Sequence, residues 1–145
     1  MSTPRADLLE AFKRTIYRVY LPGYTLDLCI GTHLPQLDVL LLTLGARRWI
    51  VFSPCNPGAR LLDPETNMAR MTALRENLDS EGLRHFPAEG IPPEGEDWPP
   101  EPSLLILDVP QRQIARWAHR FGQLAWVAGE LGQPAELVWS SLPKV

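Results

Sequence analysis

Cysteine is scarce in this chain of 145 residues, which has only Cys29 and Cys55. Two cysteines without CxxC spacing are too few for a disulfide framework, so free thiols are expected. Long apolar runs are also lacking, because runs such as residues 39–42 are far shorter than the roughly 20 residues of a membrane span. Charges occur throughout residues 1–14, so no leader is expected either, and the sequence predicts a cytoplasmic protein without a membrane segment.

An excess of one charge is lacking as well, since 14 basic and 17 acidic residues leave a formal net charge of −3 at pH 7. Without a basic run, general nucleic-acid binding is not expected. The histidines His33, His85 and His119 show no paired spacing with one another or with the cysteines, which argues against a metal site. Glycine-rich phosphate motifs and the G-x-S-x-G motif are absent too, so neither a cofactor nor a serine nucleophile is predicted.

Proline is plentiful instead, with 15 residues against a usual share of about 5%. The first cluster follows residues 49–52, a short aromatic and β-branched run that predicts a central strand covered on both faces. Pro54 and Pro57 end that strand, because each removes a backbone amide donor. A helix is then predicted from residue 64 to residue 81, with Asp63 as its cap, a proline in its first turn and a glycine beyond its end.

The remaining periodicity predicts three further helices and six further strands. The helices are expected over residues 6–14, about 35–44 and about 109–121, and the strands over residues 15–21, 24–30, 83–86, 103–109, 124–128 and 136–139. Residues 87–102 are expected to form an irregular, acidic, proline-rich loop around Trp98. The chain is therefore predicted to be a single α/β domain over residues 1–145, of the α+β type, with a mixed sheet of six or seven strands flanked by about four helices.

Several short motifs follow one another in a characteristic order. They are Asn56-Pro57 after the aromatic strand, Asn67 near the start of the next helix, Gly90, then Trp98, Glu101 and Ser103, and finally Phe121-Gly122-Gln123. With these motifs the chain resembles the uncharacterised bacterial family called Domain of Unknown Function 3293, from Tyr17 to about Trp126. Two positions depart from the family pattern: Cys55 stands where members often have tryptophan, and an extra proline precedes Glu101. The family has no established activity, so the resemblance implies a shared site without naming its chemistry.

Polar side chains from three separate segments are expected to meet where the strands at residues 49–52 and 103–109 end. Ligands in α/β sheets gather at such ends, because backbone amides and helix starts converge there. The candidate ligand-binding residues are Asn56, Arg60, Asn67, Trp98, Ser103 and Gln123, and Glu101 is the candidate general acid or base. Amide donors and acceptors with one carboxylate suit a pocket for a small polar metabolite.

The same residues also have structural interpretations. Asparagine and glutamine side chains tie long loops to a sheet, and Glu101 beside three prolines has the setting of a solvated loop residue. Arg60 has the setting of a surface arginine, and Cys55, near a helix start but without a base beside it, is expected to be structural. A rival function from another class is a non-catalytic interaction protein, which docks a protein partner through the rigid loop around Trp98.

Overall fold

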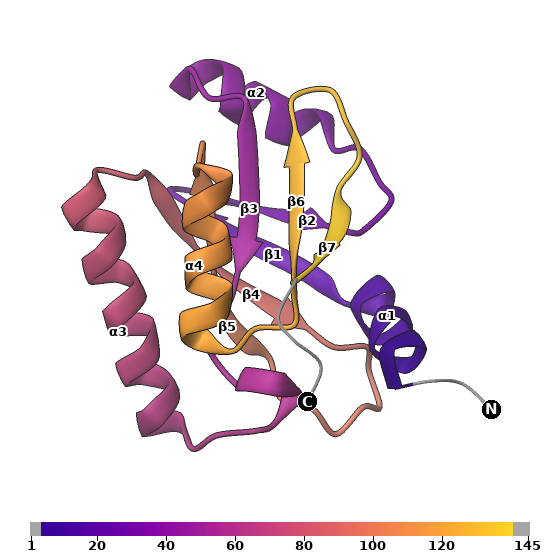
Figure 1. The fold of residues 1–145 in the computed structure, drawn as a ribbon. Coiled ribbons are helices and arrows are strands. Elements are labelled where there is room, and N and C mark those ends of the chain that lie inside the picture. The colour runs from indigo at the N-terminus through magenta and orange to yellow at the C-terminus, as the bar shows by residue number, and fades with distance from the viewer. Residues whose placement is uncertain (1–3, 141–145) are drawn as a thin grey trace.

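The computed structural model describes residues 4–140 (Figure 1) and contains four α-helices and seven strands. The helices are α1 (Pro4–Arg14), α2 (Pro35–Leu44), α3 (Pro64–Glu81) and α4 (Gln111–Phe121), with a short 3₁₀ turn at Pro57–Ala59. The strands are β1 (Ile16–Leu21), β2 (Tyr24–Leu28), β3 (Arg48–Phe52), β4 (His85–Ile91), β5 (Glu101–Leu107), β6 (Ala125–Glu130) and β7 (Glu136–Trp139). The predicted single α/β domain with a seven-stranded sheet and four helices is confirmed.

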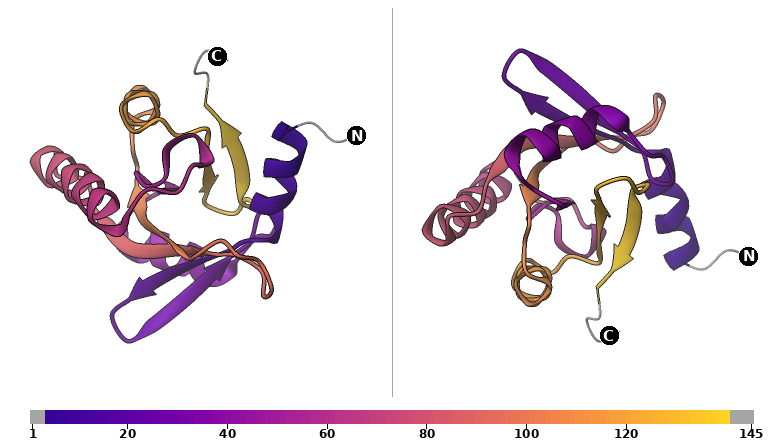
Figure 2. Two further views of the ribbon diagram at one scale, coloured as in Figure 1. Left: turned by 90° about the horizontal axis from the view of Figure 1, so that it is seen from below. Right: turned by 90° about the horizontal axis from the view of Figure 1, so that it is seen from above.

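The seven strands form one sheet in the order β2-β1-β4-β5-β3-β6-β7. All neighbouring strands pair antiparallel, and the parallel component is a single bridge between Ile30 and Ala135. The sheet curls round on itself, and α1 lies beside the gap between β1 and β7 (Figure 2). The Ile30–Ala135 bridge connects the segment after β2 to the segment before β7, so the two halves of the curled sheet meet there.

Residues of β3 and β5 are buried on both faces of the sheet, which confirms the prediction from the apolar run at residues 49–52. Trp49 and Val51 pack in one core with α2, whereas Ile50 and Phe52 pack in the other with α3 and α4. α3 and α4 lie side by side over that second face (Figure 1). The indole of Trp117 on α4 packs 6.1 Å from the Phe52 ring and fills the space between the helices and the sheet.

The boundaries of α3 agree with the prediction from its end signals. Asp63 caps the helix by accepting a hydrogen bond from the backbone amide of Thr66 at 3.1 Å. Gly82 then adopts a left-handed conformation with φ of 67° and ends the helix, because glycine reaches this conformation without the strain of a side chain. The start of α3 is therefore held at a defined distance from the end of β3.

The predicted irregular loop over residues 87–102 is wrong at both of its ends. β4 continues through Pro87 to Ile91, and β5 already begins at Glu101. Ala88 and Gly90 are buried and pair with β1 and β5, so the second half of β4 presents small side chains to the core and gives a weak strand signal in the sequence. Pro87 is tolerated because the ladder with β1 ends at Ala88, which leaves Pro87 a partner strand on one side only. The irregular segment is residues 92–100.

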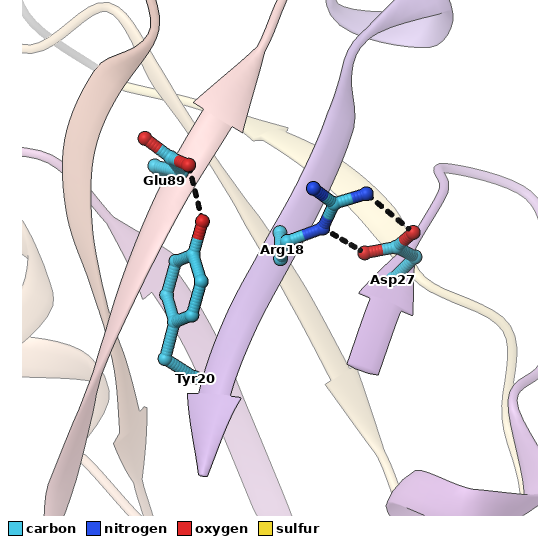
Figure 3. Close-up of polar contacts among 4 residues, drawn as sticks. All are labelled: Arg18, Tyr20, Asp27 and Glu89. Carbon is cyan, nitrogen blue, oxygen red and sulfur yellow. Dashed lines mark hydrogen bonds and ion pairs between the residues drawn. The ribbon is translucent and has the colours of Figure 1, made fainter. Parts of the chain in front are cut away.

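The outer face of β1 carries polar pairs instead of a covering helix (Figure 3). The Arg18 guanidinium donates to both carboxylate oxygens of Asp27 on β2, at 2.8 and 3.1 Å, and the Tyr20 hydroxyl donates to Glu89 on β4. Such cross-strand pairs stabilise the strand pairing only modestly, because their charges are exposed to water. This face of β1 is therefore stable in contact with water. The opposite face of β1 packs in the core and is the enclosed one.

Candidate functional site

A cavity of about 280 Å³ opens on the enclosed face, at the end of the sheet where β1 and β5 begin and β4 ends. Its walls come from α1, the loop after β3, the loop of residues 92–100 and the segment after α4. The polar residues of its lining are Thr15, Tyr17, Asn56, Glu96, Glu101 and Gln123. The volume lies just below the usual range for ligand pockets, which is about 300–1,000 Å³, so the cavity suits a compact molecule.

Asn56 is held in one orientation by hydrogen bonds on both ends of its amide. Its side-chain oxygen accepts from the Asn67 side-chain amide at 2.8 Å and from the Leu62 backbone amide at 2.9 Å. Its own backbone amide donates to the Asn67 side-chain oxygen at 3.0 Å. Two donors on the oxygen leave its Nδ2 to face Glu101, to which it donates at 3.0 Å.

Glu101 lines the cavity and has a strongly displaced pKa. Burial raises the pKa of Glu101 to about 7, and hydrogen bonds from Asn56 and Ser53 offset part of that effect. The carboxyl is half-buried on the first residue of β5, so the interpretation as a solvated loop residue does not hold. Near neutral pH it is present in both protonation states, which lets it donate or accept a proton.

Gln123 and Cys55 join the loop after β3 to the segment after α4. The Gln123 side-chain amide donates to the Cys55 carbonyl at 2.6 Å, and the Gly58 amide donates to the Gly122 carbonyl at 2.9 Å. Burial raises the pKa of the Cys55 thiol to about 11, so this thiol is protonated and unreactive at neutral pH. Gln123 thus has the predicted structural role of an amide that ties loops together, and it also lines the cavity.

The turn that carries Asn56 has an unusual backbone. Asn56, Gly58 and Ala59 all have positive φ angles, of 50°, 63° and 60°. The left-handed conformation costs a residue with a side chain such as Ala59 roughly 1–2 kcal/mol, and asparagine tolerates it better. Both Asn56 and Ala59 line the cavity, so the strain lies at the proposed site, where strained residues tend to gather in proteins.

Tyr17 lines the cavity and was missed by the sequence analysis. Its side chain is buried, with 6% of its surface exposed, and its hydroxyl has no hydrogen-bond partner among the described residues. Burial raises the pKa of Tyr17 above its ordinary range, so the hydroxyl stays neutral and can donate or accept. A signal was present, because Tyr17 alternates with Val19 and Leu21 along β1 and such a position predicts a buried hydroxyl that needs a partner.

Four of the seven predicted site residues line the cavity: Asn56, Trp98, Glu101 and Gln123. The other three lie elsewhere. Asn67 holds Asn56 from behind, and the buried Ser103 donates its hydroxyl to the Glu101 carbonyl at 3.1 Å. Arg60 is exposed and lies outside the lining. Their roles in ligand binding stay predictions, and the arrangement favours those of the first four.

Within residues 4–140 no group of three or more histidine, cysteine, aspartate or glutamate side chains is arranged to hold a metal ion. No helix of this part of the chain is long and apolar enough to cross a membrane. The polar groups that line the cavity are amides, hydroxyls and carboxyls.

The protein is a small α/β domain with a curled antiparallel sheet. A cavity lined by carboxyl groups opens at one end of that sheet. The chain belongs to the family described as Protein of unknown function (DUF3293), whose family model matches residues 52–126. The match begins at the end of β3 and includes Asn56, Glu101 and Gln123, whereas α1 and β1 precede it. No curated protein and no solved structure matches the chain.

Proposed function

We propose that the protein binds a small metabolite in the cavity and that Glu101 exchanges a proton with the bound molecule. The observation that carries the proposal is the Asn56–Glu101 hydrogen bond of 3.0 Å at the edge of a cavity whose other walls are mostly apolar. Pockets of this composition, with few polar groups among apolar side chains, are the usual form of a small-molecule site.

The geometry supports acid–base chemistry at one carboxyl. The Asn56 amide stabilises ionised Glu101, while burial favours the protonated form. A group whose pKa lies near the working pH has both forms available, which is the condition for effective general acid or base catalysis. Binding is the core of the proposal, and proton transfer is the reaction step that these residues could supply.

The proposed setting is the cytoplasm of a bacterium, following the family resemblance. Both cysteines are free, and Cys55 is buried. Free thiols support a reducing compartment, because disulfides persist mainly in oxidising ones.

A ligand screen with a blocked-cavity variant tests the binding proposal. Gly90 lines the cavity with ordinary φ, and a Cβ there would lie 3.5 Å from the Thr15 methyl. Gly90→Val should therefore fill part of the cavity without backbone strain. Thermal-shift and NMR screening of small acids, amines, sugars and nucleosides should find a compound that stabilises the wild-type protein and not Gly90→Val. If no compound shifts either protein, or if both respond equally, the proposal fails.

The rival function is supported by one observation at the same place. The Trp98 side chain is 37% exposed and stands at the rim of the cavity. An exposed tryptophan on a short loop is a typical anchor for a protein interface. A partner captured by the wild type and by Gly90→Val, and lost with Trp98→Ala, would favour docking over metabolite binding.

A further inference from the structure

The charged groups that line the cavity are all acidic. Glu96 and Glu101 contribute carboxyls, and among the described residues that form the lining there is no lysine, arginine or histidine. An anionic ligand would enter a partly dry space beside Glu101, where the lining offers no cation to compensate its charge. Desolvation of unpaired like charges is strongly unfavourable, so the charge pattern disfavours acids and phosphates.

Three arginines in segments near the cavity do not change this pattern. Arg14 lies at the end of α1 and pairs with Glu96 at 2.7 Å, with more than half of its own side chain exposed. Arg60 follows the turn of Asn56 and is exposed outside the lining. Arg70 points its guanidinium away, onto the Pro54 and Phe121 carbonyls. Each of these arginines is therefore either paired or outside the cavity.

Aromatic rings from three elements line the same cavity as the acidic groups. Phe12 comes from α1, Tyr17 from β1 and Trp98 from the loop of residues 92–100, and all three line the cavity. Aromatic faces attract cations through their quadrupole, with tryptophan the strongest. The buried Tyr17 hydroxyl, which has no partner among the described residues, adds an acceptor for a charged N–H donor.

From this combination we infer that the ligand is a small organic cation, with an ammonium or amidinium group against Glu101 and an apolar or aromatic body between Phe12 and Trp98. The inference rests on the proposed function, because it requires that the cavity binds a small molecule. It adds the chemical class, which the family and the fold leave open. A body of one or two rings fits a cavity of about 280 Å³.

Cation binding at Glu101 links affinity to pH. Tyr17 on β1 and Cys55 in the facing loop both have raised pKa values and stay neutral between pH 6 and pH 8. Glu96 from the third side is paired with Arg14 at 2.7 Å. Glu101, with a pKa of about 7, is thus the facing group that changes charge. Its ionised fraction rises about tenfold from pH 6 to pH 8, and the affinity for a cation should rise with it.

Matched ligands that differ only in charge test the inference. The probes are 2-phenylethylamine, 2-phenylethanol and 3-phenylpropionate, with tryptamine and indole-3-propionate as a second pair. Calorimetry or NMR titration should show binding of the amines, weaker binding of the alcohol and none of the acids. Amine affinity should increase about tenfold from pH 6 to pH 8, since the amines stay protonated throughout.

The carboxyl is tested with Glu101→Gln and with Glu76→Gln, an exposed glutamate on α3, as its matched control. Glu101→Gln should reduce amine affinity tenfold or more at pH 8 and remove the pH dependence, while 2-phenylethanol binds to it as to the wild type. That unchanged alcohol binding also shows that the variant cavity is folded. Glu76→Gln should behave as the wild type.

The results that would contradict a cationic ligand differ from those that would contradict metabolite binding. Acids that bind as tightly as the amines, or amine binding unchanged by Glu101→Gln, would overturn the cation assignment and leave a metabolite pocket standing. If neither the probes nor the wider screen gave a ligand that Gly90→Val excludes, both would be overturned.

Discussion

At the scale of single residues, Glu101 has the clearest consequence for stability. Its carboxyl has a pKa of about 7 in the folded protein against an ordinary value of 4.5. Between these values the folded state binds more protons than the unfolded state, so this group lowers the free energy of unfolding as pH rises. The full difference is on the order of 3 kcal/mol, at the rate of 1.36 kcal/mol per pKa unit.

We therefore expect Glu101→Gln to change the pH profile of stability. The amide cannot ionise, so the variant should lack the loss that the wild type shows from about pH 5 to pH 8. Urea denaturation at both pH values should show the variant gaining stability relative to the wild type by about 2–3 kcal/mol. An equal difference at both pH values would mean that burial does not shift this carboxyl.

Asn56 combines a buried amide with a left-handed backbone, and two substitutions separate these contributions. Asn56→Gly removes the side-chain hydrogen bonds to Glu101, Leu62 and Asn67, keeps the backbone one to Asn67 and tolerates φ of 50°. It should lower the free energy of unfolding by about 2–4 kcal/mol, because buried partners are left unsatisfied. Asn56→Ala should lower it by about 1 kcal/mol more, because alanine adds backbone strain. Chemical denaturation measures both values, and equal stabilities would contradict the left-handed turn.

At the scale of elements, the antiparallel pairing of β3 with β6 depends on one glycine. A Cβ at Gly129 would lie 2.5 Å from the indole of Trp49, which is 3% exposed and cannot move aside. Gly129→Ala should therefore lower the free energy of unfolding by about 2–3 kcal/mol, as overpacking does elsewhere.

Gly90→Ala is the matched control for that experiment. Gly90 also lies in a central strand, but a Cβ there meets the nearest atom at 3.5 Å, an ordinary contact. Its effect should stay within about 1 kcal/mol. Thermal or chemical denaturation of Gly129→Ala and Gly90→Ala measures both effects. Similar losses of stability in the two variants would show that contact with Trp49 is not the cause.

The elements themselves could be predicted from sequence where local signals are strong. α3 has a cap, a first-turn proline and a terminal glycine, and its predicted range is the observed one. β4 was mostly missed, because Pro87, Ala88 and Gly90 lack strand propensity and are held in place by β1 and β5. Pairing with strands that are distant in sequence therefore outweighed the low strand propensity of these residues.

At the scale of the whole molecule, the site was predicted in part. Asn56 follows the end of β3, Glu101 begins β5 and Gln123 follows the end of α4. Their meeting at one edge could therefore be expected from topology. Tyr17 and the α1 wall could not, because their position depends on how far the sheet curls. The curl is set by side-chain packing between strands that are distant in sequence. The periodicity of apolar residues carries no information about that packing.

The curled sheet should open from its edges and not from its centre. β3 and β5 have buried side chains on both faces, whereas β7 is a short edge strand of partly exposed residues. Amide hydrogen exchange should show the slowest rates in β3 and β5, close to global unfolding, and rates at least tenfold faster in β7. Uniform rates across the sheet would contradict this order.

The division of the cavity between chain segments has an evolutionary consequence. The family match over residues 52–126 includes the carboxyl and the amide that orients it, whereas Leu8, Phe12 and Tyr17, which also line the cavity, come from the first two elements. Relatives that share the matched part and diverge before it would keep Asn56 and Glu101, the pair proposed to exchange a proton, and would have a cavity of different shape. Ligand specificity would then change through the residues of α1 and β1, while the proposed proton exchange at Glu101 is retained.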